Sequence, residues 1–171
     1  MKQLFLGLLI AALISGCSYK PSSYYAKQAL GNKIYADVTI SRQDPKNSVL
    51  IKDAVNEAVV SRFGAKLVSK AEAESVLHVK IDSINFSPTV YDRFGYVVAY
   101  KATVILAIQY EDANKKVQKL TASGEYDFSI ESNSVVSDNN RFDAIRYAAN
   151  DALDEFVSKI AIKGLRNGNN N

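Results

Sequence analysis

The segment from Tyr96 to Tyr110 constrains the fold more than any other part of the chain. Its apolar residues alternate over fifteen positions, which is typical of a β-strand with one face against a core. At about 3.3 Å per residue this strand would reach roughly 50 Å, well beyond the usual strand length. We therefore expect a long hairpin arm whose core side carries Tyr96, Val98, Tyr100, Ala102, Val104, Leu106, Ile108 and Tyr110.

The opposite face of this strand is also partly apolar. Polar residues interrupt it at Lys101, Thr103 and Gln109. In a two-layer domain the helices cover only one face of the sheet, so an apolar second face suggests contact with a partner. The candidate partner-interface residues are Val97, Ala99, Ile105 and Ala107. A moderately apolar but exposed surface is the alternative interpretation.

Periodicity along the rest of the chain predicts the remaining elements. Strands are expected at residues 34–40, from Val76 onward with a bulge near Asp82 and Ser83, and at residues 117–130, with Pro88 ending regular pairing or marking a sheet edge. Helices are expected at about 47–63 and from about 138 to Gly164. The order βαβββα predicts an α+β two-layer sandwich, in which a four-stranded mixed sheet carries two helices on one face.

The N-terminus has the three regions of a secretory signal peptide. Lys2 precedes an apolar run from Leu4 to Ile14 that is too short to span a bilayer. The run ends at Ser15, Gly16 and Cys17, which resembles the lipobox of bacterial lipoproteins. A diacylglycerol thioether and an N-acyl chain on Cys17 would anchor the mature protein, and no other cofactor is expected. An aspartate after the cysteine would favour the inner membrane, so Ser18 favours the outer membrane.

These signals divide the chain into four parts. Residues 1–16 form the signal peptide, 17–33 an extended lipidated tether, 34–165 a single domain, and 166–171 a disordered tail. Cys17 is the only cysteine, so no internal disulfide can form and the fold must be held by packing. The net charge of +3 is far from that of a nucleic-acid binder, so no nucleic-acid partner is expected.

The residues needed for most catalytic chemistry are missing. His78 is the only histidine and is interpreted as a solvated residue on the polar side of a strand. A Cys–His pair or a zinc site cannot be assembled from one such residue, and phosphate-binding or nucleophile-elbow motifs are absent from the mature chain. The carboxylate pairs lie on polar faces, where solvation explains them. The sequence therefore predicts no enzyme and no metal site.

Several segments, in their order along the chain, resemble the lipopolysaccharide-assembly lipoprotein family LptE, in the form found in Campylobacter and its relatives. These segments are residues 18–21 after the lipobox, 33–38, 47–58, 124–131 and 152–156. The resemblance implies an α/β sandwich seated inside the outer-membrane β-barrel LptD. There it would act as a plug and help to deliver lipopolysaccharide to the cell surface.

Lipopolysaccharide as a ligand implies basic residues that meet the phosphates of lipid A. The candidates are Arg93 in a turn, Lys101 on the partly apolar strand face, and the cluster around the next turn formed by Lys115, Lys116 and Lys119. For each residue alone, a lysine or arginine that keeps a turn soluble is the alternative.

Two other functions stay open at this point. One is a different outer-membrane lipoprotein, an adaptor that regulates another envelope complex such as a peptidoglycan synthase. It would need a long disordered tether, whereas about fifteen residues separate Cys17 from the first expected strand. The other is an enzyme, which would require a pocket with clustered perturbed groups.

Overall fold

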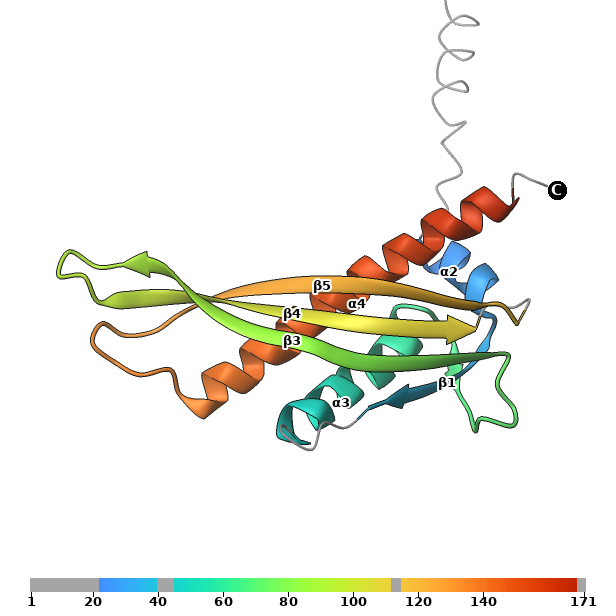
Figure 1. Ribbon diagram of the computed structural model, residues 1–171, viewed down its shortest axis with the longest axis horizontal. Helices are drawn as coiled ribbons and strands as arrows, with labels where there is room; N and C mark the ends of the chain where they lie inside the picture. Colours follow the sequence, from blue (N-terminus) through green and yellow to red (C-terminus); the bar gives the residue numbers. More distant parts are fainter. Residues whose placement is uncertain (1–21, 40–44, 112–114, 169–171) are drawn as a thin grey trace, which may run out of the picture.

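The structure, a computed structural model, describes residues 22–39, 45–111 and 115–168, so the predicted signal peptide and Cys17 lie outside it. Figure 1 shows a long twisted sheet with helices packed on one face. The strand order is β2-β1-β3-β4-β5, with β1 parallel to β2 and β3 and the remaining pairs antiparallel. The elements in chain order are α2 (Ser22–Leu30), β1 (Lys33–Val38), α3 (Pro45–Ser61), β2 (Lys66–Leu67), β3 (Ser75–Tyr91), β4 (Val97–Glu111), β5 (Val117–Ser129) and α4 (Asp138–Gly168).

The α+β class and the mixed sheet are confirmed, but the predicted count of four strands and two helices is wrong. The fifth strand, β2, has only two residues, which pair with Lys33 and Ile34. The third helix, α2, lies within the predicted extended tether. Its Ala26 and Leu30, one turn apart, are buried in the core, so tertiary packing supplies the stability that the short sequence pattern lacks.

The end of the last helix also differs from the prediction. The helix continues past Gly164 to Gly168, so residues 166–168 of the predicted disordered tail are helical. Residues 169–171 lie outside the described part. A glycine inside a helix costs only about 1 kcal/mol relative to alanine, and the long packed helix before it tolerates that cost. No helix in the described ranges is both long enough and apolar enough to cross a membrane.

The long hairpin arm is confirmed. Strands β3 and β4 pair antiparallel along their length, and β3 bulges between Ile81 and Ser83, as predicted. Pro88 lies within the strand and pairs with Tyr100, but the register shifts just after it, so regular pairing ends there as predicted. The arm extends past the helices at one end of the molecule in Figure 1, while α2 lies at the other end.

The core lies between the sheet and helices α3 and α4. Alternate β4 residues from Ala102 to Tyr110 are buried, as their periodicity predicts. Phe156 of α4 packs edge-on against Phe63 and Tyr110, with ring centroids 5.7 Å apart in both pairs. These aromatic contacts join α4 to the segment just after α3 and to the end of β4.

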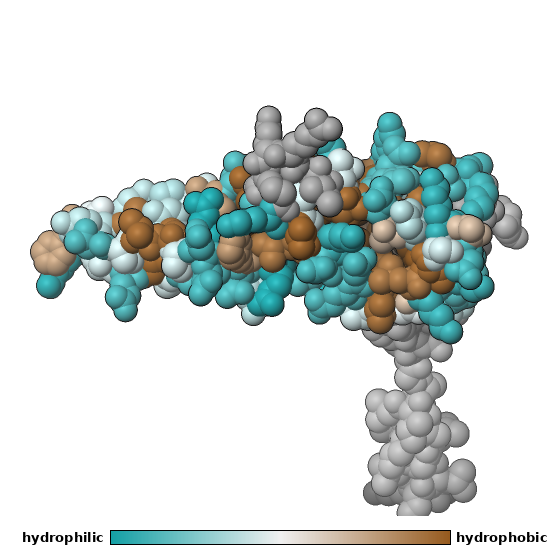
Figure 2. Space-filling view, turned by 90° about the horizontal axis from the view of Figure 1, so that it is seen from below, coloured by the Kyte–Doolittle hydropathy of each residue, from teal (hydrophilic) through white to brown (hydrophobic). Residues whose placement is uncertain are grey.

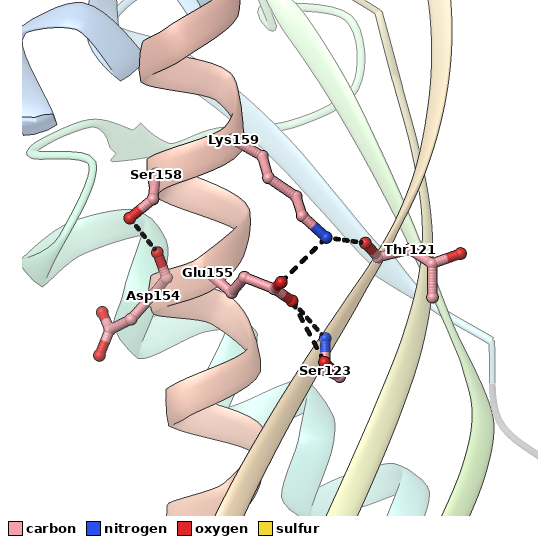
Figure 3. A network of polar contacts seen from close by, with 6 residues as sticks. All are labelled: Thr121, Ser123, Asp154, Glu155, Ser158 and Lys159. Atoms are coloured by element: carbon pink, nitrogen blue, oxygen red, sulfur yellow. Dashed lines mark hydrogen bonds and ion pairs between the residues drawn. The ribbon is translucent and has the colours of Figure 1, made fainter.

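Strand β5 is an edge of the sheet, and α4 covers part of that edge (Figure 3). The backbone N–H of Ser123 donates to Glu155 at 2.6 Å, and that of Glu125 donates to Asp151 at 2.9 Å. Lys159 donates to the carbonyl of Thr121 at 2.8 Å and pairs with Glu155 at 3.0 Å. Helix side chains therefore take the place of a further strand, and we call these contacts the β5 clamp.

The β5 clamp depends on how closely the helix approaches the strand. A Cβ atom at Gly124 would collide with backbone atoms of Ala148, Asp151 and Ala152. Glycine is therefore required here for contact between two backbones rather than for an unusual turn. The absence of a side chain lets α4 lie close enough for Asp151 and Glu155 to reach the edge of the strand.

Candidate functional site

The candidate site lies on the sheet face that carries no helix among the described residues, here called the open face (Figure 1). Val97, Ala99, Ile105 and Ala107 all lie on this face and are half-buried, whereas their neighbours Ala102, Val104, Leu106 and Ile108 are buried under the helices. The predicted division of β4 into two faces is therefore confirmed from Ala102 to Tyr110. It fails toward the hairpin tip, where Val98 and Tyr100 are only half-buried and Tyr96, predicted for the core side, is 48% exposed and precedes the strand. Contact of the open face with a partner stays a prediction.

A groove of 540 Å³ crosses the open face near the end that is remote from the hairpin tip. Its polar lining follows from strand register: Asp37, His78, Gln109 and Lys119 lie opposite one another in one row across four strands. The next row on the same face, one step closer to the hairpin tip, consists of Lys80, Ala107 and Thr121. The groove is lined by Thr39, His78, Val79, Lys80, Ala107, Ile108, Gln109, Lys119, Leu120 and Thr121.

The groove is positively charged. Lys80 and Lys119 are exposed, and neither takes part in an ion pair within the described ranges. His78 is half exposed, with its Nδ1 3.3 Å from an Asp37 carboxylate oxygen. Two ammonium groups beside the hydroxyl and amide groups of Thr39, Thr121 and Gln109 suit a phosphate or carboxylate. The arrangement can bind an anion.

The structure does not gather the five predicted cations into one site. Lys119 lines the groove, whereas Arg93 lies in the hairpin turn with its guanidinium 4.7 Å from the centre of the Phe94 ring. Lys115 donates to the carbonyl of Glu74 at 2.8 Å, and Lys116 is exposed beside it. Strand β4 separates Arg93 from these lysines by its fifteen residues, roughly 50 Å.

Lys101 lies on the open face but already has a partner. Its ammonium is 2.6 Å from the Glu125 carboxylate, and the hydrogen bond and charge of Glu125 raise the pKa of Lys101. Asp127, directly opposite in register, adds to this effect. A lysine neutralised in this way is a weaker anion ligand than Lys80 or Lys119.

The hairpin tip is ordered by Asp92. Its carboxylate accepts the backbone N–H groups of Phe94 at 2.8 Å and Tyr96 at 2.9 Å, and it also accepts the Ser132 hydroxyl. These hydrogen bonds, that of Ser132 above all, lower the pKa of Asp92. The turn presents four exposed apolar or aromatic side chains, Val90, Tyr91, Phe94 and Tyr96.

Sequence reasoning missed Lys80 and Gln109 as groove residues and treated His78 only as a solvated residue. The alternation of β3 places His78 and Lys80 on its polar side, which is a usable signal. Their meeting with Lys119 depends on the pairing of three strands, which periodicity within one strand does not give. No group of three or more potential metal-binding side chains occurs in the part of the chain that the structure describes.

Comparison with known proteins identifies the family. The family model described as "LptE: Lipopolysaccharide-assembly" matches residues 35–160. A candidate lipoprotein from Caulobacter crescentus has a similar fold, with a TM-score of 0.53 and 14% identity, over 85% of this chain and 96% of that one. Rare lipoprotein B from Shewanella oneidensis also aligns, with 14% identity and a TM-score of 0.43, over 81% and 95% of the two chains. No curated protein matches the chain by sequence.

The family match covers β1 to α4, and therefore includes the groove and the β5 clamp. The family consists of non-enzymatic lipoproteins, in agreement with the prediction that the chain is not an enzyme. The chain therefore belongs to the LptE family of lipopolysaccharide-assembly lipoproteins.

Proposed function

We propose that this protein is the lipoprotein partner of an LptD-type β-barrel in the outer membrane, as a Campylobacter-type member of its family. Lipid on Cys17 anchors it, and its domain sits within the barrel lumen as a plug that assists lipopolysaccharide insertion. The observation that carries the proposal is the open face, where half-buried Val97, Ala99, Ile105 and Ala107 follow one another along β4 and Ala107 borders a cationic groove. Such a face can contact the wall of a protein barrel and bind an anionic ligand at the same time.

Within this proposal, the groove receives phosphate groups of lipid A. Lys119 is the predicted candidate that we favour, and Lys80 joins it because both line the groove without an acidic partner. Arg93 lies too far away to share this ligand and would serve a separate phosphate contact. Lys115 already donates to the Glu74 carbonyl, and Lys116 lies three residues before Lys119, at the end of the groove's strand. Lys101 would contribute less because Glu125 already pairs with it.

Co-purification tests the contact with the barrel. The full-length lipoprotein is isolated from detergent-solubilised outer membrane, where we expect a large β-barrel at equal stoichiometry. Ile105→Asp places a charge on the open face and should abolish recovery of the barrel. The matched control is Val60→Asp on α3, whose side chain is 57% exposed. Equal recovery of the barrel with both variants would contradict the proposal. So would isolation of the wild-type lipoprotein without any barrel.

Binding of lipopolysaccharide to the purified mature protein tests the groove. The double variant Lys80→Ala/Lys119→Ala should bind at least about tenfold more weakly, since it removes two charge-assisted contacts. Lys52→Ala/Lys70→Ala removes the same charge from exposed positions elsewhere and should leave the affinity unchanged. If both double variants weaken binding equally, net charge rather than the groove attracts the ligand.

A further inference from the structure

The edge of β3 beyond its pairing with β1 differs from every other long edge of the sheet. β1 pairs with β3 only from Ser75 to Val79, and the last backbone contact on that side is the Thr39 N–H donating to the Val79 carbonyl at 2.9 Å. From Lys80 to Tyr91, β3 pairs only with β4 in the described ranges. Among the residues that the structure describes, the outward backbone groups of this part of β3 have no strand partner and form an unpaired edge.

The regular part of this edge is short and well defined. The bulge between Ile81 and Ser83 interrupts pairing on one side, and the register shifts after Pro88 on the other. Between them, Ser83–Ser87 keeps a continuous register with β4 over five residues, about 17 Å. Asn85 and Ser87 are exposed, and this segment carries no charge. Such an edge can accept a strand by backbone hydrogen bonding.

Side chains from the first turns of α3 and α4 lie beside this edge. We call these side chains, Lys46, Val49, Arg141 and Phe142, the helix floor. In Figure 1 the first turns of α3 and α4 lie past β3, on its unpaired side. The Arg141 guanidinium lies 4.8 Å from the Phe86 ring centre, and the Lys46 ammonium lies 6.0 Å from that of Phe142. Val49, on the same end of α3, is 49% exposed. Figure 2, which views the molecule from below, shows brown hydrophobic patches separated by teal atoms along the arm.

The charges of this floor indicate the chemistry of its occupant. Arg141 and Lys46 are exposed, and within the described residues neither forms an ion pair with a carboxylate. The rings of Phe86 and Phe142 are half-buried between them. An added strand would place alternate side chains on this floor, so apolar and acidic side chains would complement it.

A second copy of this chain fits the edge less well than a single strand. Antiparallel pairing of two β3 edges requires a two-fold axis perpendicular to the sheet, which puts the helices of both copies on the same side. The first turns of α3 and α4 already occupy that side next to the edge. A lone strand needs only the space of about 4.8 Å beside β3.

We propose that the β3 edge at Ser83–Ser87 binds an extended segment of a partner protein as an added strand, with apolar and acidic side chains facing Phe142, Arg141 and Lys46. This contact is separate from the groove on the open face. It uses the backbone of β3 for affinity and the helix floor for selectivity.

The probe for this site is a synthetic peptide in which every second residue is in turn valine and glutamate, with threonine between them, so that one face of the strand carries both kinds of side chain. Added to the full mature lipoprotein in detergent, it should protect backbone amides of β3 between Ser83 and Ser87 from hydrogen exchange. The same peptide with every amide N-methylated cannot donate a backbone hydrogen bond along either edge and should give no protection. Protection at Lys80 and Lys119 in the groove without protection at Ser83–Ser87 would overturn the proposal.

Two arginines of α4 provide a matched pair of variants. Arg141→Glu reverses the charge on the floor and should weaken peptide binding at least about tenfold. Arg146→Glu reverses another exposed charge, one that lies 5.1 Å from the Tyr147 ring centre and pairs with Asp143, and it should leave binding unchanged. Equal effects of the two variants would overturn the proposal. So would protection of Ser83–Ser87 by self-association without peptide, measured by sedimentation at rising concentration.

Discussion

The two long edges of the sheet are treated in opposite ways. On β5, side chains of α4 satisfy outward backbone groups of three alternate residues, Thr121, Ser123 and Glu125, and Gly124 allows the helix to come close enough to do so. On β3, the segment Ser83–Ser87 has no such cover among the described residues. Exposed edges invite pairing with other chains, and proteins usually block them. Blocking one edge and leaving the other unpaired directs any strand addition to a single side of the molecule.

The largest expected effect comes from removing the close approach at β5. Gly124→Val introduces a side chain where the backbone of α4 lies, so either the helix or the strand must move. We expect a loss of at least about 3 kcal/mol in the free energy of unfolding, measured by chemical denaturation. Ala99→Val, which adds methyl groups on the open face, should change it by less than about 0.5 kcal/mol. Equal stabilities would show that α4 does not lie against β5.

A smaller loss is expected when the β5 clamp is opened at one residue. Glu155→Ala leaves the Ser123 N–H without its acceptor, and because the Glu155 side chain is 38% exposed, water replaces part of the lost bond. The free energy of unfolding should fall by about 1 kcal/mol. The Ser123 amide should also exchange faster, while the Asn85 amide on β3 is unaffected. Glu57→Ala on the exposed side of α3 is the control.

The β5 clamp should also depend on pH. The Ser123 N–H and then Lys159 hold the pKa of Glu155 below its ordinary value of 4.5. A carboxylate with a lowered pKa stabilises the folded state above pH 4.5, and this contribution is lost as the pH falls through the folded pKa. The difference in unfolding free energy between wild type and Glu155→Gln should therefore be greatest near neutral pH and shrink below 4.5. A difference that grows on acidification would contradict this role.

The smallest effect is expected at the unpaired edge. Asn85→Lys adds a charge to an exposed position on β3, and the free energy of unfolding should change by less than about 0.5 kcal/mol. The corresponding change on the clamped strand, Ser123→Lys, should cost more because it crowds Glu155 and its hydrogen bonds. A large loss from Asn85→Lys would indicate that the β3 edge is covered in the folded protein.

Local periodicity predicted those parts of the fold in which the burial of each residue follows from its position within a single strand or helix. The faces of β4, the bulge near Ser83 and the main helices followed from the spacing of apolar residues within one segment. The helix α2 and the two-residue strand β2 were missed because neither is long enough to show a period, and both depend on packing against distant elements. The end of α4 was missed because Gly164 resembles a helix stop.

The groove could not be predicted for a different reason. Asp37, His78, Gln109 and Lys119 belong to four strands and meet only because of their register. Charge along the chain pointed instead to the turn that contains Lys115 and Lys116 and to Arg93 at the hairpin tip. A single lysine in an alternating strand does not by itself indicate a binding site in the sequence. Lys80 and Lys119 form one because strand pairing places them on adjacent rows of the open face.

The position of α2 determines how much freedom an anchored molecule would have. Because Ala26 and Leu30 are fixed in the core, only residues 18–21 separate the proposed lipid site at Cys17 from the folded domain. A chain of that length extends at most about 18 Å. The domain would thus be held close to the bilayer surface by a short linker, with its hairpin arm at the end of the molecule opposite α2 (Figure 1). Its search for a membrane partner would then be confined to a thin layer, which raises the effective concentration of each for the other.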